Sequence, residues 1–245
     1  MFCMRIVALS LAVALVDWPG RVVRAAEPPA LGTVTRPAAF TESPRSLQKR
    51  IRFPPVEGDV FVRLDCDAAV SRKGTVRYTY CFAPDSRFVR FERAIATAAS
   101  YAVIAPAMTE GVPHTVWFQY RVEFERRGPV EDIRVYPNQG LQVATFGTDY
   151  SAPQRLNDRF PESFWERCPL RTKLWVTATV SEEGRSEAVS VEANGQGIPE
   201  CRAALLNLIQ RSRFIPAFAG GQPVRAHYRE MFYSPSAARA IGFSE

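Results

Sequence analysis

The sequence has little of the chemistry that most enzymes need. It holds only two histidines, His114 and His227, among 245 residues. It contains no Gly-x-Ser-x-Gly, no His-Glu-x-x-His and no phosphate-cradling glycine loop, so nucleophilic, metal and nucleotide chemistry all lack their usual signatures. The neighbouring carboxylates Asp65 and Asp67 are typical of a solvated strand face, and Glu182-Glu183 is typical of a turn. We therefore expect no catalytic residues and no cofactor.

Other absences narrow the choice of partner. No stretch interleaves Lys or Arg with aromatic residues, and no nucleic-acid-binding motif is present, which argues against a nucleic-acid partner. The formal net charge of +6 suits anionic surroundings such as lipid head groups, cell-wall polymer or acidic proteins. A basic surface that serves only solubility is the simpler interpretation of this charge.

Long hydrophobic runs are also absent, apart from one short run near the N-terminus. Arg5 precedes the largely apolar stretch 6–16, and Val23-Arg-Ala25 places small or apolar residues at the positions that a signal peptidase reads. The run would span only about 16 Å as a helix, against the roughly 30 Å hydrocarbon core of a membrane. We predict a signal peptide over residues 1–25, cleaved after Ala25, and a periplasmic protein. The alternative is that the segment is retained as a membrane anchor.

Cleavage there would remove Cys3 and leave four cysteines, Cys66, Cys81, Cys168 and Cys201, in an oxidising compartment. Zinc is the rival explanation for such a set, but no Cys-x-x-Cys or Cys/His ligand spacing is present, so we expect no metal site. If strands 60–70 and 75–82 form a hairpin with Lys73-Gly74 at its tip, Cys66 and Cys81 lie opposite each other. We predict a cross-strand disulfide there and a second one between Cys168 and Cys201.

The chain contains an internal repeat. A shift of 110 positions places Pro106-Ala107 on Pro216-Ala217, Gly111 on Gly221, Pro113 on Pro223, Ser71 on Ser181 and Gly74 on Gly184, without a gap. The same shift places the cysteines of the predicted hairpin on Val176 and Val191, a β-branched pair suited to the same cross-strand contact. Because turn residues match on both sides of a helical segment, we interpret the chain as a tandem duplication of one small fold.

Each copy is predicted to contain two strands, a helix and a closing strand. The fold class is thus α+β, with two tandem small β–β–α–β modules, each an antiparallel sheet packed against one helix. We divide the chain into a signal peptide (1–25), a flexible leader (26–53), the first module (54–125), a connector (126–157), the second module (158–234) and a tail (235–245). The connector contains one expected strand, over residues 141–146.

The periodicity also predicts which residues face each core. The first helix has an apolar stripe of Phe88, Phe91, Ile95, Ala98, Ala99 and Ala102, and the second has Cys201, Ala204, Leu205, Leu208 and Ile209. The last strand alternates Arg225, His227 and Arg229 with Ala226, Tyr228 and Phe232. Glu230 interrupts the apolar face of that strand.

The second module resembles the C-terminal domain of TonB-family proteins. The resemblance rests on Phe160-Pro161, on Ser212-Arg-Phe-Ile-Pro-Ala217 at the helix exit, and on Gly221-x-Pro-Val224 before the last strand. In the first module it rests on Cys66, Gly74 and Cys81 of the hairpin, with Pro106-Ala107, Gly111 and Pro113. The two copies together cover about two-thirds of the chain.

The resemblance implies a periplasmic domain that binds protein partners, notably by adding a strand from an outer-membrane receptor to its sheet edge. On this basis we expect partner binding at the closing strand, by Arg225, His227 and Arg229; pairing within the fold, or plain solvation, is the simpler alternative. The chain lacks the long Pro-rich spacer of an energy transducer and has no Gln-Pro before the second module. We therefore predict a secreted, non-catalytic interaction protein, whose partner is an outer-membrane receptor or a cell-wall component. The alternatives are a membrane-anchored energy-transducer relative and, for assembly, a homodimer through edge strands.

Overall fold

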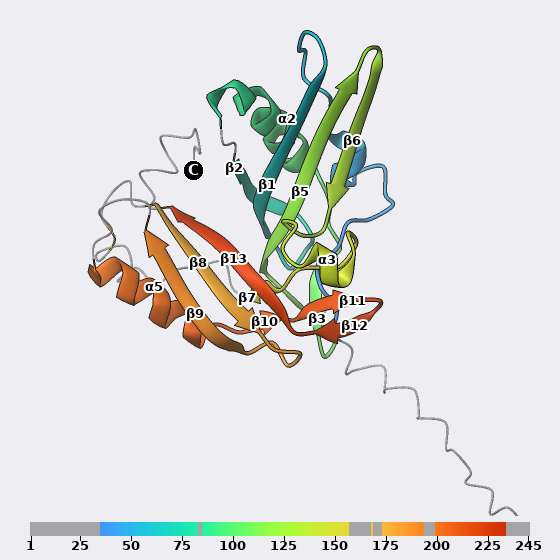
Figure 1. Cartoon of the computed structure of the whole chain (residues 1–245). Helices are drawn as coiled ribbons and strands as arrows, with labels where there is room; N and C mark the ends of the chain where they lie inside the picture. The colour runs from blue at the N-terminus through green and yellow to red at the C-terminus, as the bar shows by residue number, and fades with distance from the viewer. Residues whose placement is uncertain (1–34, 83–84, 157–167, 169–172, 194–198, 234–245) are drawn as a thin grey trace, which may run out of the picture.

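The computed structural model describes residues 35–82, 85–156, 168, 173–193 and 199–233. The chain is α+β, with antiparallel strands and short helices arranged in two larger sheets and two small hairpins (Figure 1). The predicted signal peptide and the tail lie outside the described residues. No helix in the described ranges is long and apolar enough to cross a membrane.

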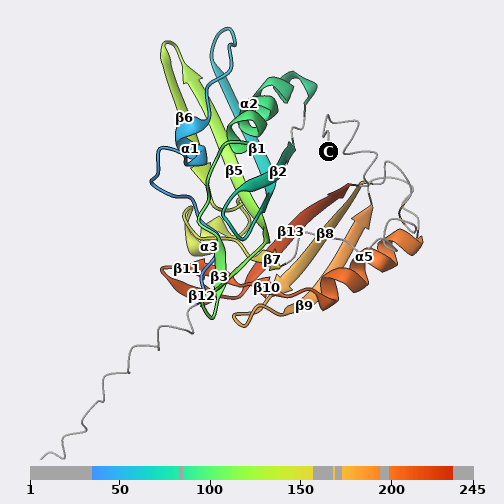
Figure 2. The same cartoon turned by 180° about the vertical axis from the view of Figure 1, so that it is seen from behind.

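The first sheet has six strands in the order β10-β7-β5-β1-β2, with β6 also pairing with β5. Its main strands are β1 (Val60–Val70), β2 (Val76–Phe82), β5 (Val116–Arg127) and β6 (Val130–Tyr136). A 3-10 turn (Ser86–Phe88) leads into α2 (Val89–Ala99), which covers one face of the sheet (Figure 2). As the periodicity predicts, Phe91, Ile95 and Ala99 of α2 are buried in the core.

Alternation along β1 and β5 decides which face of the first sheet is apolar. Leu64 and Cys66 of β1 and Phe118 and Tyr120 of β5 are fully buried in the core that contains α2. The intervening positions, which carry Arg63, Asp65, Gln119 and Arg121 among others, lie on the opposite face because successive strand residues alternate. That polar face is the one that meets the second sheet.

The predicted flexible leader is wrong from residue 36 onward. Residues 36 and 39 form bridges to residues 108 and 105, and a short helix, α1 (Leu47–Arg50), packs on the core. Ala38, Leu47 and Ile51 are buried, and Gln154 hydrogen-bonds to both backbone groups of Ala38 at 2.8 Å. Three well-spaced apolar residues therefore anchor a segment whose composition suggests disorder.

The predicted connector is largely part of the first sheet. β6 forms a hairpin with β5, and β7 (Gln154–Leu156) pairs with the start of β5 and with β10 (Phe214–Ile215). The strand expected over 141–146 is wrong, because Val143–Phe146 forms a helical turn, α3, after Gln142 in the left-handed region at φ 59. The closing strand of the first predicted module is therefore a central strand of the sheet.

The second sheet has three strands in the order β13-β8-β9. Its strands are β8 (Lys173–Val180), β9 (Ser186–Ala193) and β13 (Ala226–Tyr233), and α5 (Pro199–Arg211) packs on one face (Figure 2). Cys201, Leu205 and Ile209 of α5 are buried as predicted, with Ala204 and Leu208 partly buried beside them. Tyr228 and Phe232 of β13 belong to the same core.

Corresponding hairpins recur 110 positions apart. The hairpin of β3 (Ala107–Thr109) and β4 (Val112–His114) pairs Ala107 with His114, and that of β11 (Ala217–Ala219) and β12 (Gln222–Val224) pairs Ala217 with Val224. The predicted cross-strand pairing of Val176 with Val191 is confirmed. In the first sheet, the corresponding positions 110 residues earlier are the paired Cys66 and Cys81.

Both predicted disulfides are present. Cys66 and Cys81 join β1 to β2 across the hairpin, with an S–S length of 2.09 Å. Cys168 and Cys201 join the segment before β8 to the start of α5, with an S–S length of 2.12 Å. Each bridge connects elements around one of the two main cores.

Candidate functional site: the edges of the second sheet

The strand that the sequence selects for partner binding, β13, lies at an edge of the second sheet. It pairs with β8 along its length, from Ala226 opposite Val180 to Tyr233 opposite Lys173. In an antiparallel pair, the backbone groups of alternate residues point toward and away from the neighbouring strand. The contacts described next show that those of His227, Arg229 and Met231 point away from β8.

Three side chains of the first sheet and its loops occupy these outward backbone groups. The Gln142 side-chain oxygen accepts a hydrogen bond of 2.5 Å from the His227 backbone N–H. The Gln119 amide donates to the Arg229 carbonyl, and the Tyr80 hydroxyl donates to the Met231 carbonyl at 2.6 Å. A strand added to this edge would need the same groups, so the first sheet already occupies the edge that the sequence favours.

The side chains of the three predicted binding residues have separate partners. Arg225 forms an exposed ion pair of 2.5 Å with Glu187. His227 is exposed, with its Nδ1 3.5 Å from the Thr179 hydroxyl. The Arg229 guanidinium lies 3.9 Å from the centre of the Trp175 ring. His227 and Arg229 lie on β13 and Arg225 directly precedes it, but the three side chains do not converge on one point where a ligand group could sit.

A buried ion pair joins β13 to the first sheet. Arg155 of β7 donates from Nε and Nη2 to the two carboxylate oxygens of Glu230, at 3.0 and 2.9 Å. The Tyr228 hydroxyl donates to the same carboxylate at 2.5 Å, and the Arg155 guanidinium lies 5.5 Å from the centre of the Trp117 ring. Glu230 can occupy a buried position in the apolar pattern of β13 because Arg155 of β7, 75 positions earlier in the sequence, neutralises its charge.

Asp67 lies close by and is also buried. It is 3 % exposed, and its Oδ1 accepts hydrogen bonds from the side-chain amides of Gln119 and Gln139 at 3.1 and 3.2 Å. Burial raises the pKa of Asp67 to about 8, the charge of Glu230 adds to this, and hydrogen bonds from Gln119 and Tyr80 oppose it. The prediction of a solvated face is therefore wrong for Asp67, because the second sheet covers this part of the first.

The opposite edge of the second sheet is open in the described part of the chain. Among the described strands, β9 pairs only with β8. Arg185, the residue just before β9, forms an isolated bridge with Arg213. Since even-numbered residues of β8 face β13, the odd-numbered ones face β9, where Thr177 pairs with Ser190. The backbone groups of Val189 and Val191 therefore point away from β8 and make no hydrogen bond with a described residue; Val189 is partly exposed, whereas Val191 is only 1 % exposed.

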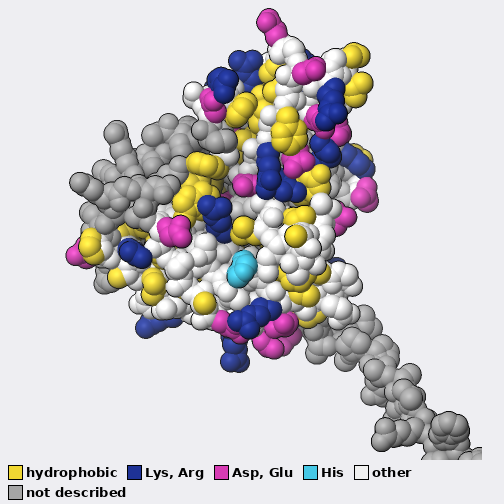
Figure 3. Space-filling model, viewed as in Figure 1, with side chains coloured by type: hydrophobic (Ala, Val, Ile, Leu, Met, Phe, Trp, Pro, Cys, Tyr) yellow, Lys and Arg dark blue, Asp and Glu magenta, His cyan; other side chains and the backbone are white. Residues whose placement is uncertain are grey.

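The two histidines of the chain lie in different elements of the structure. In Figure 3, basic and acidic side chains are interspersed over the face formed by β1, β5 and β6. His114 lies in the β3–β4 hairpin, with Nε2 2.5 Å from the Thr109 hydroxyl, and His227 lies on β13. Among the described residues, no group of three or more His, Cys, Asp or Glu side chains could hold a metal ion.

Comparison with known proteins adds no family to this description. No protein-family model matches the chain, and neither a curated protein nor a solved structure is significantly similar to it.

Proposed function

We propose that the chain is an exported, non-catalytic binding protein made of two β–β–α–β modules similar to the C-terminal domain of TonB-family proteins. We further propose that it binds a protein of the cell envelope by adding one strand of that partner to the outer edge of β9. The observation that carries this proposal is the contrast between the two edges of the second sheet. The β13 edge is occupied by Gln119, Gln142 and Tyr80, whereas the outward backbone groups of β9 meet no described residue.

Local geometry supports the two-module interpretation. Gly74 and Gly184 occupy hairpin tips with φ of 76° and 74°, and a Cβ on either would overlap a carbonyl oxygen, of Ile104 or of Phe214. Each glycine carbonyl in turn accepts a hydrogen bond from the N–H of that same residue. One backbone contact is thus built twice, 110 positions apart, with the same residue type at its centre.

The cysteines support export. All four described cysteines are paired in disulfides, which persist in oxidising compartments and are rare in the cytosol. Together with the predicted signal peptide over residues 1–25, this pairing supports the proposal of a periplasmic location.

The β9 edge has the features that strand addition requires. An incoming strand would gain backbone hydrogen bonds at the partly exposed Val189, and the side chains next to it would set specificity. Glu192 is exposed on this strand, which favours a basic residue at the facing position of the partner strand.

Site-directed photo-crosslinking in cells tests the choice of edge. A photo-reactive phenylalanine analogue replaces Glu192 on β9, His227 on β13 or the exposed Arg93 on α2 in three otherwise identical proteins. We expect a discrete crosslinked product from position 192 and none from position 93. Adding Val189→Pro should abolish the product because it removes an outward N–H, whereas Val189→Thr keeps that N–H and should retain it.

Other outcomes contradict the proposal. A product from position 227 without one from position 192 would return the binding site to β13, as the sequence predicts. A product from position 192 that survives Val189→Pro would show side-chain contact without strand addition. If the crosslinked protein also fractionated with the inner membrane and retained Met1, the anchored energy-transducer relative would be the better description.

A further inference from the structure

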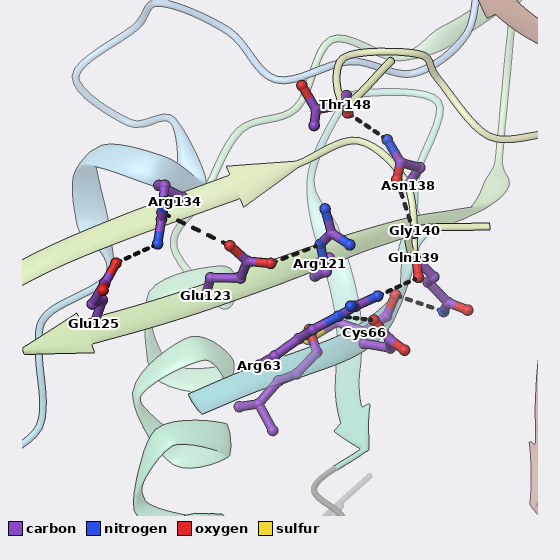
Figure 4. A network of polar contacts seen from close by, with 12 residues as sticks. Arg63, Cys66, Arg121, Glu123, Glu125, Arg134, Asn138, Gln139, Gly140 and Thr148 are labelled. Atoms are coloured by element: carbon purple, nitrogen blue, oxygen red, sulfur yellow. Dashed lines mark hydrogen bonds and ion pairs between the residues drawn. The ribbon is translucent and has the colours of Figure 1, made fainter. Parts of the chain in front are cut away.

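Two arginines of the first sheet come together at a single glycine, on the face away from α2 (Figure 4). Arg63 lies on β1 opposite Glu123, and Arg121 lies on β5 opposite Asp65, so the two arginines are diagonal neighbours. A Cβ on Gly140 would overlap both Nη1 of Arg121 and Nη2 of Arg63. The absence of a side chain at position 140 therefore lets both guanidinium groups lie close to the backbone there.

Arg121 is buried without the hydrogen bonds that a buried guanidinium usually makes. It is 6 % exposed, and its Nε has no hydrogen-bond partner among the described residues. Its contacts are an ion pair of 3.4 Å from Nε to Glu123 and the ring of Tyr136, whose centre lies 4.5 Å away. The Nε–H of Arg121 is therefore a buried donor without a hydrogen bond to a described residue.

Arg63 brings a second, accessible guanidinium to the same place. Its side chain is 46 % exposed, and its Nη2 donates a long hydrogen bond of 3.4 Å to the Gln139 carbonyl. Its nearest carboxylate oxygen is Oδ1 of Asp65, 3.9 Å from Nε. The guanidinium of Arg63 is therefore accessible to solvent and lies beside the buried Arg121.

Each of the two arginines has one carboxylate beside it. Asp65 lies 3.9 Å from Nε of Arg63, and Glu123 lies 3.4 Å from Nε of Arg121. Glu123 is shared, because its other oxygen lies 3.8 Å from Nε of Arg134, which also pairs with Glu125 at 2.6 Å. Neither Asp65 nor Glu123 forms a bidentate pair with these arginines.

We propose that Arg63 and Arg121 form a binding site for a carboxylate. Guanidinium groups hold carboxylates through paired N–H donors, and the buried Nε of Arg121 has no hydrogen-bond partner among the described residues. A phosphate dianion would bring a second negative charge close to Asp65 and Glu123. The carboxylate comes from a small molecule or from an acidic side chain of a bound protein, and both present the same planar group.

Titration of the full exported chain with acetate tests the site, with the arginine Nε–H signals followed by NMR. Chloride at the same ionic strength serves as the reference for screening. We expect acetate to shift a small set of arginine signals saturably, and Arg63→Gln to weaken binding about tenfold, the loss expected for one charged hydrogen bond. Arg127→Gln is the control. It removes one positive charge from the exposed end of β5, the strand that carries Arg121, and it should leave acetate binding unchanged.

Arg121→Lys is the second test, because it retains the charge of Arg121 but loses the planar pair of donors. We expect it to weaken acetate binding about tenfold as well, while the backbone spectrum stays that of a folded protein.

The absence of a saturable shift, or equal weakening by Arg127→Gln, would overturn the proposal. Inorganic phosphate that binds more tightly than acetate would show that the ligand class is wrong. A short acidic peptide that competes with acetate at the same signals would identify a protein carboxylate as the ligand. The site is separate from the β9 edge, so neither result depends on strand addition.

Discussion

Arg155 and Glu230 form a bidentate ion pair whose side chains are only 2 % and 3 % exposed, and this pair connects β7 of the first sheet to β13 of the second. The removal of one partner from a buried ion pair leaves an uncompensated charge, which is far more costly than the loss of the pair as a whole. The contact therefore makes the relative placement of the two sheets specific, and it helps to keep the outer edge of β13 against the first sheet.

Glu230→Ala should lower the free energy of unfolding by about 3–5 kcal/mol, because Arg155 would then be buried without a counter-charge. The double variant Arg155→Met, Glu230→Leu should recover much of that loss. Glu187→Ala is the control, since it removes an exposed pair with Arg225 and should cost at most about 1 kcal/mol. Urea unfolding measures all three, and equal effects for Glu230→Ala and Glu187→Ala would contradict the account.

Asp67 should make stability fall with rising pH. Its pKa is about 8 in the folded chain, mainly because of burial and then because of Glu230, whereas an aspartate in an unfolded chain has a pKa of about 3.9. Between these values the folded chain retains a proton that the unfolded chain has lost. The group's stabilising effect is therefore complete below about pH 4 and is lost by about pH 8.

Asp67→Asn removes this titration while it keeps an acceptor for Gln119 and Gln139. The variant should be more stable than the unchanged chain at pH 8, and its unfolding free energy should lose a slope of up to about 1.4 kcal/mol per pH unit. Urea unfolding between pH 5 and pH 9 measures this, with the exposed Asp132→Asn as the control. Parallel pH profiles for the chain and for Asp67→Asn would show that Asp67 is not responsible.

Gly74 and Gly184 should be equally intolerant of a side chain. Alanine at either position combines a positive φ with an overlap of backbone carbonyl oxygen, so each substitution should cost at least about 2 kcal/mol. Gly111→Ala separates the two effects, because Gly111 has φ 77° but open space around its Cβ position, and it should cost only about 1 kcal/mol. Thermal or urea unfolding that ranks Gly111→Ala with the other two variants would contradict the role of the close contact.

The intact mass of the natively exported protein should show a chain without residues 1–25. We expect it in the soluble periplasmic fraction, with four cysteines that react with a thiol reagent only after reduction. A membrane-bound chain that retains Met1, or cysteines that react without reduction, would contradict the proposed export and maturation.

Local patterns in the sequence predict much of this fold. The hairpin with Gly74 at its tip places Cys66 opposite Cys81, and the spacing of Cys201, Leu205 and Ile209 gives the buried face of α5. These features depend on neighbours that are close in sequence, where periodicity and turn chemistry are informative. The connector also held a usable signal, because Gly128-Pro129 precedes an alternating segment that becomes β6.

Contacts between distant segments could not be predicted in this way. Strands β7 and β10 have only a few residues each, and their pairing joins segments about sixty positions apart in sequence. The burial of Glu230 depends on Arg155, and the covering of β13 depends on Gln119, Gln142 and Tyr80, all of which look like ordinary polar residues. The sequence thus selects β13 as a binding edge because it contains no sign that the first sheet covers it.

Hydrogen exchange of single amides, measured by NMR on the chain alone, tests the contrast between the two sheet edges most directly. The account predicts that the outward amide of Val189 exchanges with little protection, whereas Ser190, bonded to β8, and His227, bonded to Gln142, are protected. Gln142→Ala should remove the protection of His227 and leave that of Ser190 unchanged. If His227 exchanged as fast as Val189 in the unchanged chain, or if Val189 were as protected as Ser190, the assignment of β9 as the open edge would be contradicted.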